Sequence, residues 1–237
     1  MKKQVIPEPE RVRELLDEHL QAAGEAEKVK LVQYYMLLIE RNNVMNLTAV
    51  TDPEGVVTRH FADSLLALEM LPHGARVIDV GTGAGLPGIP LLIMRPDIEM
   101  TLLDSLNKRI GFLSDVISRL GLSARLIHAR AEDAAQTAVL RESFDIALSR
   151  AVAELRVVSE WTLPFVCVGG SALMYKGPGA ERELADAENA LKLLNGKAEL
   201  IAISTSWGER SIVRVEKTAP TPAKYPRRAG SAERAPL

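Results

Sequence analysis

The sequence contains little of several features that mark common classes of protein. Cys167 is the only cysteine among 237 residues, which excludes an internal disulfide and a cysteine-based zinc site. The four histidines have no metal-ligand spacing, so no metal is expected. The longest apolar runs, 34–39 and 88–94, are too short to span a bilayer, and the charged, proline-containing N-terminus is unlike a signal peptide. We therefore expect a cytoplasmic protein without membrane contact.

Aromatic content and net charge are also low. Aromatic residues make up 4% of the chain and the formal net charge is −2, so neither value is typical of a nucleic-acid-binding protein. The charge is unevenly distributed, because the segment from Lys217 to the C-terminus has five Lys or Arg and one Glu. This basic end is either a solvated tail or a surface for an acidic partner.

The pattern of apolar residues changes near residue 72. Before this point apolar residues recur at helical spacing, and the Asn-rich segment 41–47 is expected to end the second helix. Thr51-Asp52-Pro53-Glu54 has the residues of a helix N-cap, which predicts a third helix. We therefore predict an N-terminal helical extension over residues 1–71.

From residue 72 to 217, predicted strands alternate with predicted helices. The strands are expected at 75–80, 99–104, 125–129, 144–148, 171–175, 200–204 and 211–215, and the helices at 89–94, 108–120, 154–166 and 181–194. This alternation predicts an α/β core with a mostly parallel sheet covered on both faces, and the last two strands as a hairpin that adds an antiparallel edge strand. Residues 218–237 are predicted to form a weakly structured basic tail, packed on or flanking the core.

A glycine-rich loop follows the first predicted strand, and its sequence is Asp79-Val80-Gly81-Thr82-Gly83-Ala84-Gly85-Leu86-Pro87-Gly88. Glycines let a ligand approach the backbone closely, and ligands of doubly wound sheets bind beyond the carboxyl ends of the strands. Asp104 ends the next strand, where a carboxylate can accept hydrogen bonds from both ribose hydroxyls of an adenosine. The loop is then either a simple tight turn or a site for NAD or S-adenosylmethionine.

Several sequence words around this loop resemble the bacterial RsmG (GidB) family. The words are Asn46-Leu47-Thr48, His60-Phe61-Ala62-Asp63-Ser64-Leu65, Leu86-Pro87-Gly88-Ile89-Pro90, Leu102-Leu103-Asp104-Ser105-Leu106-Asn107-Lys108-Arg109, Ala131-Glu132, Ser149-Arg150-Ala151 and Tyr175-Lys176-Gly177. The resemblance implies a Rossmann-like S-adenosylmethionine-dependent methyltransferase. It also implies an acceptor, N7 of one guanosine (guanine-527 in customary rRNA numbering) in the 530 stem-loop of 16S ribosomal RNA.

The resemblance also implies which residues form the site. Carried over by position, the cofactor contacts fall on Gly81, Leu86, Ala131, Glu132 and Arg150, to which the loop argument adds Gly83 and Asp104. Four residues of the family words that lie outside the cofactor contacts are candidates for the acceptor pocket, namely Asn46, His60, Asp63 and Lys176, with Asp63 the best candidate for the guanine base edge. Candidates for phosphate contacts are Lys108, Arg109, Lys224, Arg227 and Arg228.

The chemistry implied by the resemblance requires positioning alone. Guanine N7 carries a lone pair and no proton, so no catalytic base is expected, and the sequence contains no Gly-x-Ser-x-Gly nucleophile motif. We expect a monomer that acts on 16S rRNA, alone or in a partly assembled small subunit. The alternatives are a methyltransferase with another RNA, protein or small-molecule acceptor, an NAD-dependent oxidoreductase, or an assembly factor that no longer catalyses.

Overall fold

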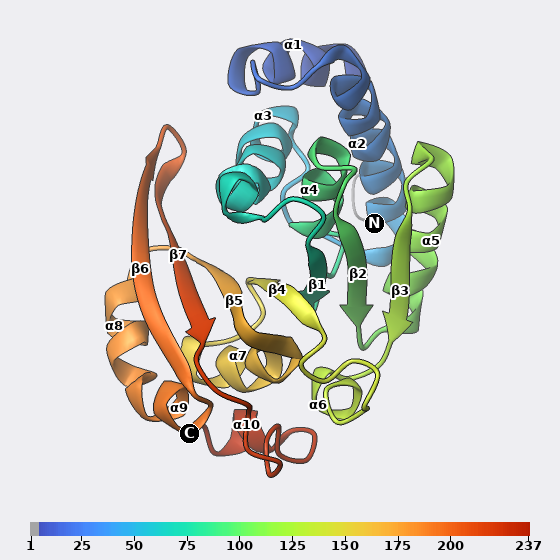
Figure 1. Ribbon diagram of the computed structural model, residues 1–237. Helices are drawn as coiled ribbons and strands as arrows, with labels where there is room; N and C mark the ends of the chain where they lie inside the picture. Colours follow the sequence, from blue (N-terminus) through green and yellow to red (C-terminus); the bar gives the residue numbers. More distant parts are fainter. Residues whose placement is uncertain (1–4) are drawn as a thin grey trace.

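The computed structural model describes residues 5–237, in which seven strands form one sheet (Figure 1). The first four residues of the charged N-terminus lie outside the described part of the chain. The strand order is β3-β2-β1-β4-β5-β7-β6, and β7 is antiparallel to both of its neighbours. The strands are β1 (Arg76–Val80), β2 (Glu99–Asp104), β3 (Ala124–His128), β4 (Phe144–Arg150), β5 (Val166–Lys176), β6 (Gly196–Thr205) and β7 (Gly208–Lys217). The mostly parallel sheet with an antiparallel hairpin at its edge is therefore confirmed.

Helices cover both faces of the sheet because alternate strand residues point to opposite sides and both sets are apolar. In β1, for example, Val77 belongs to one buried cluster and Ile78 to the other. One face carries α2 (Glu25–Met45), α4 (Gly88–Met94) and α5 (Asn107–Leu120), and the other carries α7 (Leu155–Thr162), α8 (Ala180–Asp186) and α9 (Glu188–Leu193). The shorter helices are α1 (Pro9–His19), α3 (Pro53–Gly55), η1 (Val56–Ala62), η2 (Leu65–Met70), α6 (Ala131–Ala134), η3 (Leu163–Phe165) and α10 (Ser231–Arg234).

The N-terminal helices share a hydrophobic core with the sheet rather than forming one of their own. Tyr34 of α2 is fully buried and stacks on Phe61, with 5.6 Å between the ring centroids. Its hydroxyl donates a 2.6 Å hydrogen bond to the carbonyl oxygen of Ala84, in the middle of the glycine loop. The extension thus supports the loop directly.

Local sequence signals set some helix boundaries correctly and others wrongly. The N-cap prediction is confirmed, because the Asp52 carboxylate accepts a 2.7 Å hydrogen bond from the Gly55 N–H. Helix α2 ends at Met45, inside the Asn-rich segment 41–47 as predicted, and is capped by Asn46 in the left-handed conformation. The predicted helix 154–166, however, is too long, since Pro164 lies in the short 3-10 helix η3 that separates α7 from β5. A proline has no backbone N–H to continue an α-helix.

The C-terminal tail packs on the core, as predicted, and α10 is its one helix, but its backbone is held by more contacts than a weakly structured segment would have. Arg141 donates to the carbonyl oxygens of Thr221 and Tyr225, each at 2.8 Å, and the Tyr225 ring is buried. Glu142 accepts a 2.6 Å hydrogen bond from the Thr221 N–H. Composition gave no sign of these contacts because they join residues about 80 positions apart.

Candidate functional site

The predicted site residues follow the carboxyl ends of neighbouring strands. Gly81 follows β1, Asp104 ends β2, Arg150 ends β4 and Lys176 ends β5. The chain winds from β1 outward through β2 to β3, and then continues on the other side of β1 with β4 and β5. Ligands of such sheets bind in the crevice where the winding reverses, here between β1 and β4.

The glycine loop is held to the strands beside it by its own backbone and by Asp79. The N–H groups of Gly81 and Thr82 both donate to the carbonyl oxygen of Leu103, at 2.9 and 3.0 Å. Asp79 is fully buried and accepts hydrogen bonds from the Thr82 hydroxyl and from the Gly88 N–H. Burial raises the pKa of Asp79 to about 6. A Cβ at Gly88 would lie 2.8 Å from the Asp79 carboxylate, so this packing requires glycine.

A cavity of about 190 Å³ lies beyond the ends of β1 and β2. It is called the β1–β2 cavity below, and its lining includes Gly81, Asp104, Ala131, Glu132, Trp161 and Glu233. The structure thus brings together four of the seven predicted cofactor residues. Of the other three, Gly83 donates its N–H to Asp104 at 2.9 Å, Leu86 is buried in the core, and Arg150 lines a second cavity.

Two buried carboxylates border the β1–β2 cavity. Asp104 is 2% exposed and accepts hydrogen bonds from the N–H groups of Gly83 and Leu106 and from the Arg109 guanidinium, which is 3.1 Å away. Glu132 is 5% exposed and accepts a 2.9 Å hydrogen bond from the Gly230 N–H of the tail. Arg109, predicted to contact phosphate, is therefore paired with Asp104 instead, because this buried carboxylate lies within its reach.

The second cavity, of about 580 Å³, lies beyond the ends of β4 and β5 and is called the β4–β5 cavity. Its lining includes the predicted residues His60, Asp63, Arg150 and Lys176, together with Arg59 and Arg210. Asn46 is not among its lining residues; it caps α2 in the left-handed conformation that asparagine tolerates. The structure thus assembles three of the four acceptor-pocket candidates.

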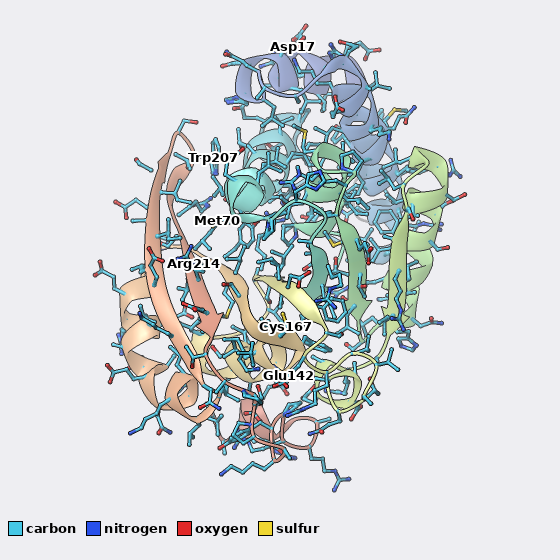
Figure 2. The ribbon with its side chains drawn as sticks, in the orientation of Figure 1. Asp17, Met70, Glu142, Cys167, Trp207 and Arg214 are labelled. Atoms are coloured by element: carbon cyan, nitrogen blue, oxygen red, sulfur yellow. The ribbon has the colours of Figure 1, made fainter. Side chains whose placement is uncertain are left out.

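Asp63 lies at the centre of an ionic cluster at this cavity. It is 6% exposed, and its carboxylate accepts hydrogen bonds from Arg150 at 3.0 Å and from Arg210 at 2.6 Å. The indole N–H of Trp207 also donates to this carboxylate, at 3.3 Å. Trp207 lies in the turn between β6 and β7 and is labelled in Figure 2. Two guanidinium groups engage Asp63, which therefore does not present a free carboxylate to a base edge. Its observed role is to hold Arg150.

The two other predicted residues of this cavity are also held by internal contacts. Nε2 of His60 is 2.7 Å from the Thr48 hydroxyl, and burial together with the charge of Arg150 lowers the pKa of His60 to about 4. The imidazole is therefore neutral at physiological pH. Lys176 donates to the carbonyl oxygen of Ala153 and to the Glu183 carboxylate, at 2.8 and 2.7 Å.

The two cavities are adjacent because Val152 lines both. Gly81 has a φ of +72°, and a Cβ there would lie 3.0 Å from the Val152 side chain, so the loop after β1 meets the loop after β4 at this point. Ala151, which precedes Val152 in the chain, has a φ of +55°. This conformation is strained for a residue with a Cβ, and such strain recurs at functional sites. The two cavities therefore lie side by side at Val152.

The basic candidates for RNA contact divide into exposed and paired side chains. Lys108, Lys224 and Arg228 are exposed, whereas Arg227 forms an ion pair with the buried Glu160 at 2.6 Å. Arg227, predicted to contact phosphate, is therefore held by an internal ion pair. Arg210 was missed, because neither its spacing nor its neighbours in the sequence connect it with Asp63.

Metal-ligand clusters and membrane-spanning helices are both absent from residues 5–237. No group of three or more His, Cys, Asp or Glu side chains in that part of the chain is arranged to hold a metal ion. None of the helices there is both long and apolar enough to cross a bilayer.

Known proteins resemble the chain in sequence and in fold. The family model for rRNA small subunit methyltransferase G (GidB) matches residues 27–213. Ribosomal RNA small subunit methyltransferase G of Lactobacillus delbrueckii subsp. bulgaricus is 42% identical over 97% of this chain and 99% of its own length, and that of Clostridium beijerinckii is 47% identical over 88% and 90%. A methyltransferase from Pyrococcus furiosus has a similar fold, with a TM-score of 0.55, 17% identity and coverage of 79% of this chain and 98% of its own.

Proposed function

Because the chain belongs to the RsmG (GidB) family of rRNA small subunit methyltransferase G, we propose that it methylates N7 of one guanosine in 16S ribosomal RNA, with S-adenosylmethionine as donor. The target is the guanosine of the 530 stem-loop that the family resemblance implies. The fold is the Rossmann-like fold of S-adenosylmethionine-dependent methyltransferases.

The residues of the β1–β2 cavity fit the adenosine part of this donor. Asp104 supplies a carboxylate for the ribose hydroxyls, and the positive φ at Gly81 lets a ligand lie against the backbone. The indole nitrogen of Trp161, which lines the cavity, is buried without a hydrogen-bond partner among the described residues. When bound, the donor supplies a methyl group on a positively charged sulfur.

The β4–β5 cavity suits the guanosine acceptor. It adjoins the β1–β2 cavity at Val152, which allows donor and acceptor to meet at one point of the crevice. Arg59 on its wall, whose side chain is 48% exposed, gives it a cationic group that complements RNA phosphates, whereas Arg210 is paired with Asp63. His60 in the same cavity is neutral, and guanine N7 has no proton to remove. The residues of the cavity therefore need only hold N7 in line with the methyl group and the sulfur of the donor.

The observation that carries the proposal is the adjacency of the two cavities at Val152, with Arg150 held on the wall of the β4–β5 cavity by Asp63. The test measures transfer of labelled methyl from S-adenosylmethionine to 16S rRNA, either free or in partly assembled small subunits. Arg150→Met should lower the rate about 100-fold, as loss of one preorganised charged group commonly does. Arg156→Met is the control, because Arg156 is a half-exposed arginine of α7 that pairs with the exposed Glu154.

Absence of label in 16S rRNA with the wild-type protein would refute the proposal. Label at a position other than guanine N7 would refute the proposed acceptor atom but not the proposed methylation of 16S rRNA. A parallel titration with NAD distinguishes the methyltransferase from the alternative, an NAD-dependent oxidoreductase. A methyltransferase should bind S-adenosylmethionine and leave NAD unreduced.

A further inference from the structure

The C-terminal tail reaches the β1–β2 cavity and forms part of its lining. The N–H of Gly230 donates to the Glu132 carboxylate at 2.9 Å, and Glu233, three residues later, lines the cavity itself. Ala232 between them is buried in the cluster that covers this face of the sheet. Figure 1 shows α10 beside α7 and close to α6, the helix that carries Glu132. The tail is therefore part of the cavity wall.

A buried ion pair holds the tail in this position. Arg227 donates to the Glu160 carboxylate through its backbone N–H, Nε and Nη2, at distances of 2.7, 2.9 and 2.6 Å. Glu160 is 1% exposed and directly precedes Trp161, which lines the cavity. Hydrogen bonds between charged groups with this two-pronged geometry are strong and directional. Arg227 thus fixes the tail to the helix that forms the opposite side of the cavity.

The distribution of charge along the tail also supports its place in the wall of the β1–β2 cavity. Residues 218–237 contain four Lys or Arg and only one acidic residue, Glu233. That one acidic side chain is the one that lines the cavity, where it joins the carboxylates of Asp104 and Glu132. A carboxylate can accept a hydrogen bond from the adenine amino group of S-adenosylmethionine. It also attracts the positively charged sulfonium of the same molecule.

We propose that the C-terminal tail is a wall of the cofactor site, and that Arg227 is a positioning residue for the cofactor rather than an RNA contact. The inference rests on the proposed function, in which the β1–β2 cavity holds the adenosine. Without the tail, Glu132 loses the N–H that orients its buried carboxylate, and a buried charge without its hydrogen bond is destabilised in that position. The cavity then binds the cofactor more weakly.

The test is calorimetric titration of S-adenosylmethionine into the full chain and three variants, without RNA. A chain ending at Arg228 lacks Gly230 and Glu233 but keeps the Tyr225 and Arg227 anchors, so it retains the contacts that hold the rest of the tail. Arg227→Met removes the anchor. Arg228→Met is its matched control, being the same substitution at the neighbouring arginine, which is exposed.

We expect the truncated chain and Arg227→Met to raise the Kd for S-adenosylmethionine at least about tenfold, or about 1.4 kcal/mol, and Arg228→Met to leave it unchanged. In methylation assays the truncation should raise the KM for S-adenosylmethionine while kcat at saturating donor stays within about twofold. Wild-type affinity in the truncated chain, or equal effects of Arg227→Met and Arg228→Met, would overturn the inference. A wild-type chain that does not bind S-adenosylmethionine would instead overturn the proposed function.

Discussion

Replacing Tyr34 by phenylalanine should weaken both the fold and the glycine loop. The substitution removes only the hydroxyl, so the ring keeps its buried position and its stacking on Phe61. What is lost is the 2.6 Å hydrogen bond to the carbonyl oxygen of Ala84, which joins α2 to the loop across 50 residues of sequence. The variant therefore isolates the one polar contact through which the N-terminal helices support the loop.

The size of the effect follows from the burial of both partners. A hydrogen bond contributes about 1 kcal/mol net, and a buried acceptor left without a donor costs about 1–3 kcal/mol, so we expect a loss of about 2 kcal/mol in the free energy of unfolding. For a chain of this length that corresponds to a Tm lower by about 4–8 °C. A loop that is ordered for a smaller fraction of the time should raise the Kd for S-adenosylmethionine by about threefold to tenfold.

Tyr35→Phe is the matched control, measured by urea unfolding and calorimetric titration alongside Tyr34→Phe. Tyr35 is the next residue of α2, is equally buried, and accepts a 3.2 Å hydrogen bond from the Glu8 N–H, far from the loop in the chain. Its loss should destabilise the fold while leaving the Kd for S-adenosylmethionine unchanged. If the two variants change that Kd equally, or if Tyr34→Phe leaves it unaltered, the proposed support of the loop by α2 is wrong.

Three further variants test the site itself. Asp104→Asn should raise the Kd for S-adenosylmethionine at least about tenfold in calorimetry, because the ribose loses a charged acceptor; an unchanged Kd would contradict the assignment. Asp63→Asn should lower the free energy of unfolding by about 3 kcal/mol and slow methylation, since Arg150 and Arg210 lose their shared partner; a stable variant with full activity would contradict this. The pKa of His60 is lowered to about 4 in the folded chain, so on acidification this imidazole is protonated in the unfolded chain before it is protonated in the folded one. The free energy of unfolding should therefore fall as the pH falls from about 6.5 to about 4. His60→Gln should lose less stability over that window in urea unfolding, and identical curves would exclude His60 as the cause.

Features that depend on residues close together in the chain were predictable from the sequence. The bounds of β2 agree with the predicted strand, and α5 ends at Gly121 in the left-handed conformation, as a glycine after an amphipathic stretch indicates. The glycine loop and Asp104 were also found in this way, because a strand, a turn and a second strand leave a local pattern. Their partner Glu132 came only from the family resemblance.

Contacts between distant parts of the chain could not be predicted in this way. Asp63 and Arg210 are 147 residues apart, and Glu160 and Arg227 are 67 apart. No periodicity or spacing connects such residues, and a basic composition in the tail does not distinguish a solvated arginine from a paired one. Composition therefore predicts a weakly structured tail, whereas the backbone N–H groups of Arg227 and Gly230 donate hydrogen bonds to the buried carboxylates of Glu160 and Glu132.

Mass mapping of 16S rRNA tests the central claim most directly. Nuclease fragments would be compared between cells that contain the protein, cells that lack it, and cells complemented with the Arg150→Met variant. We predict that one methyl group on a guanosine of the 530 stem-loop, located on N7, is present in the first case and absent or strongly reduced in the other two. Fragments of identical mass in cells with and without the protein would contradict the account.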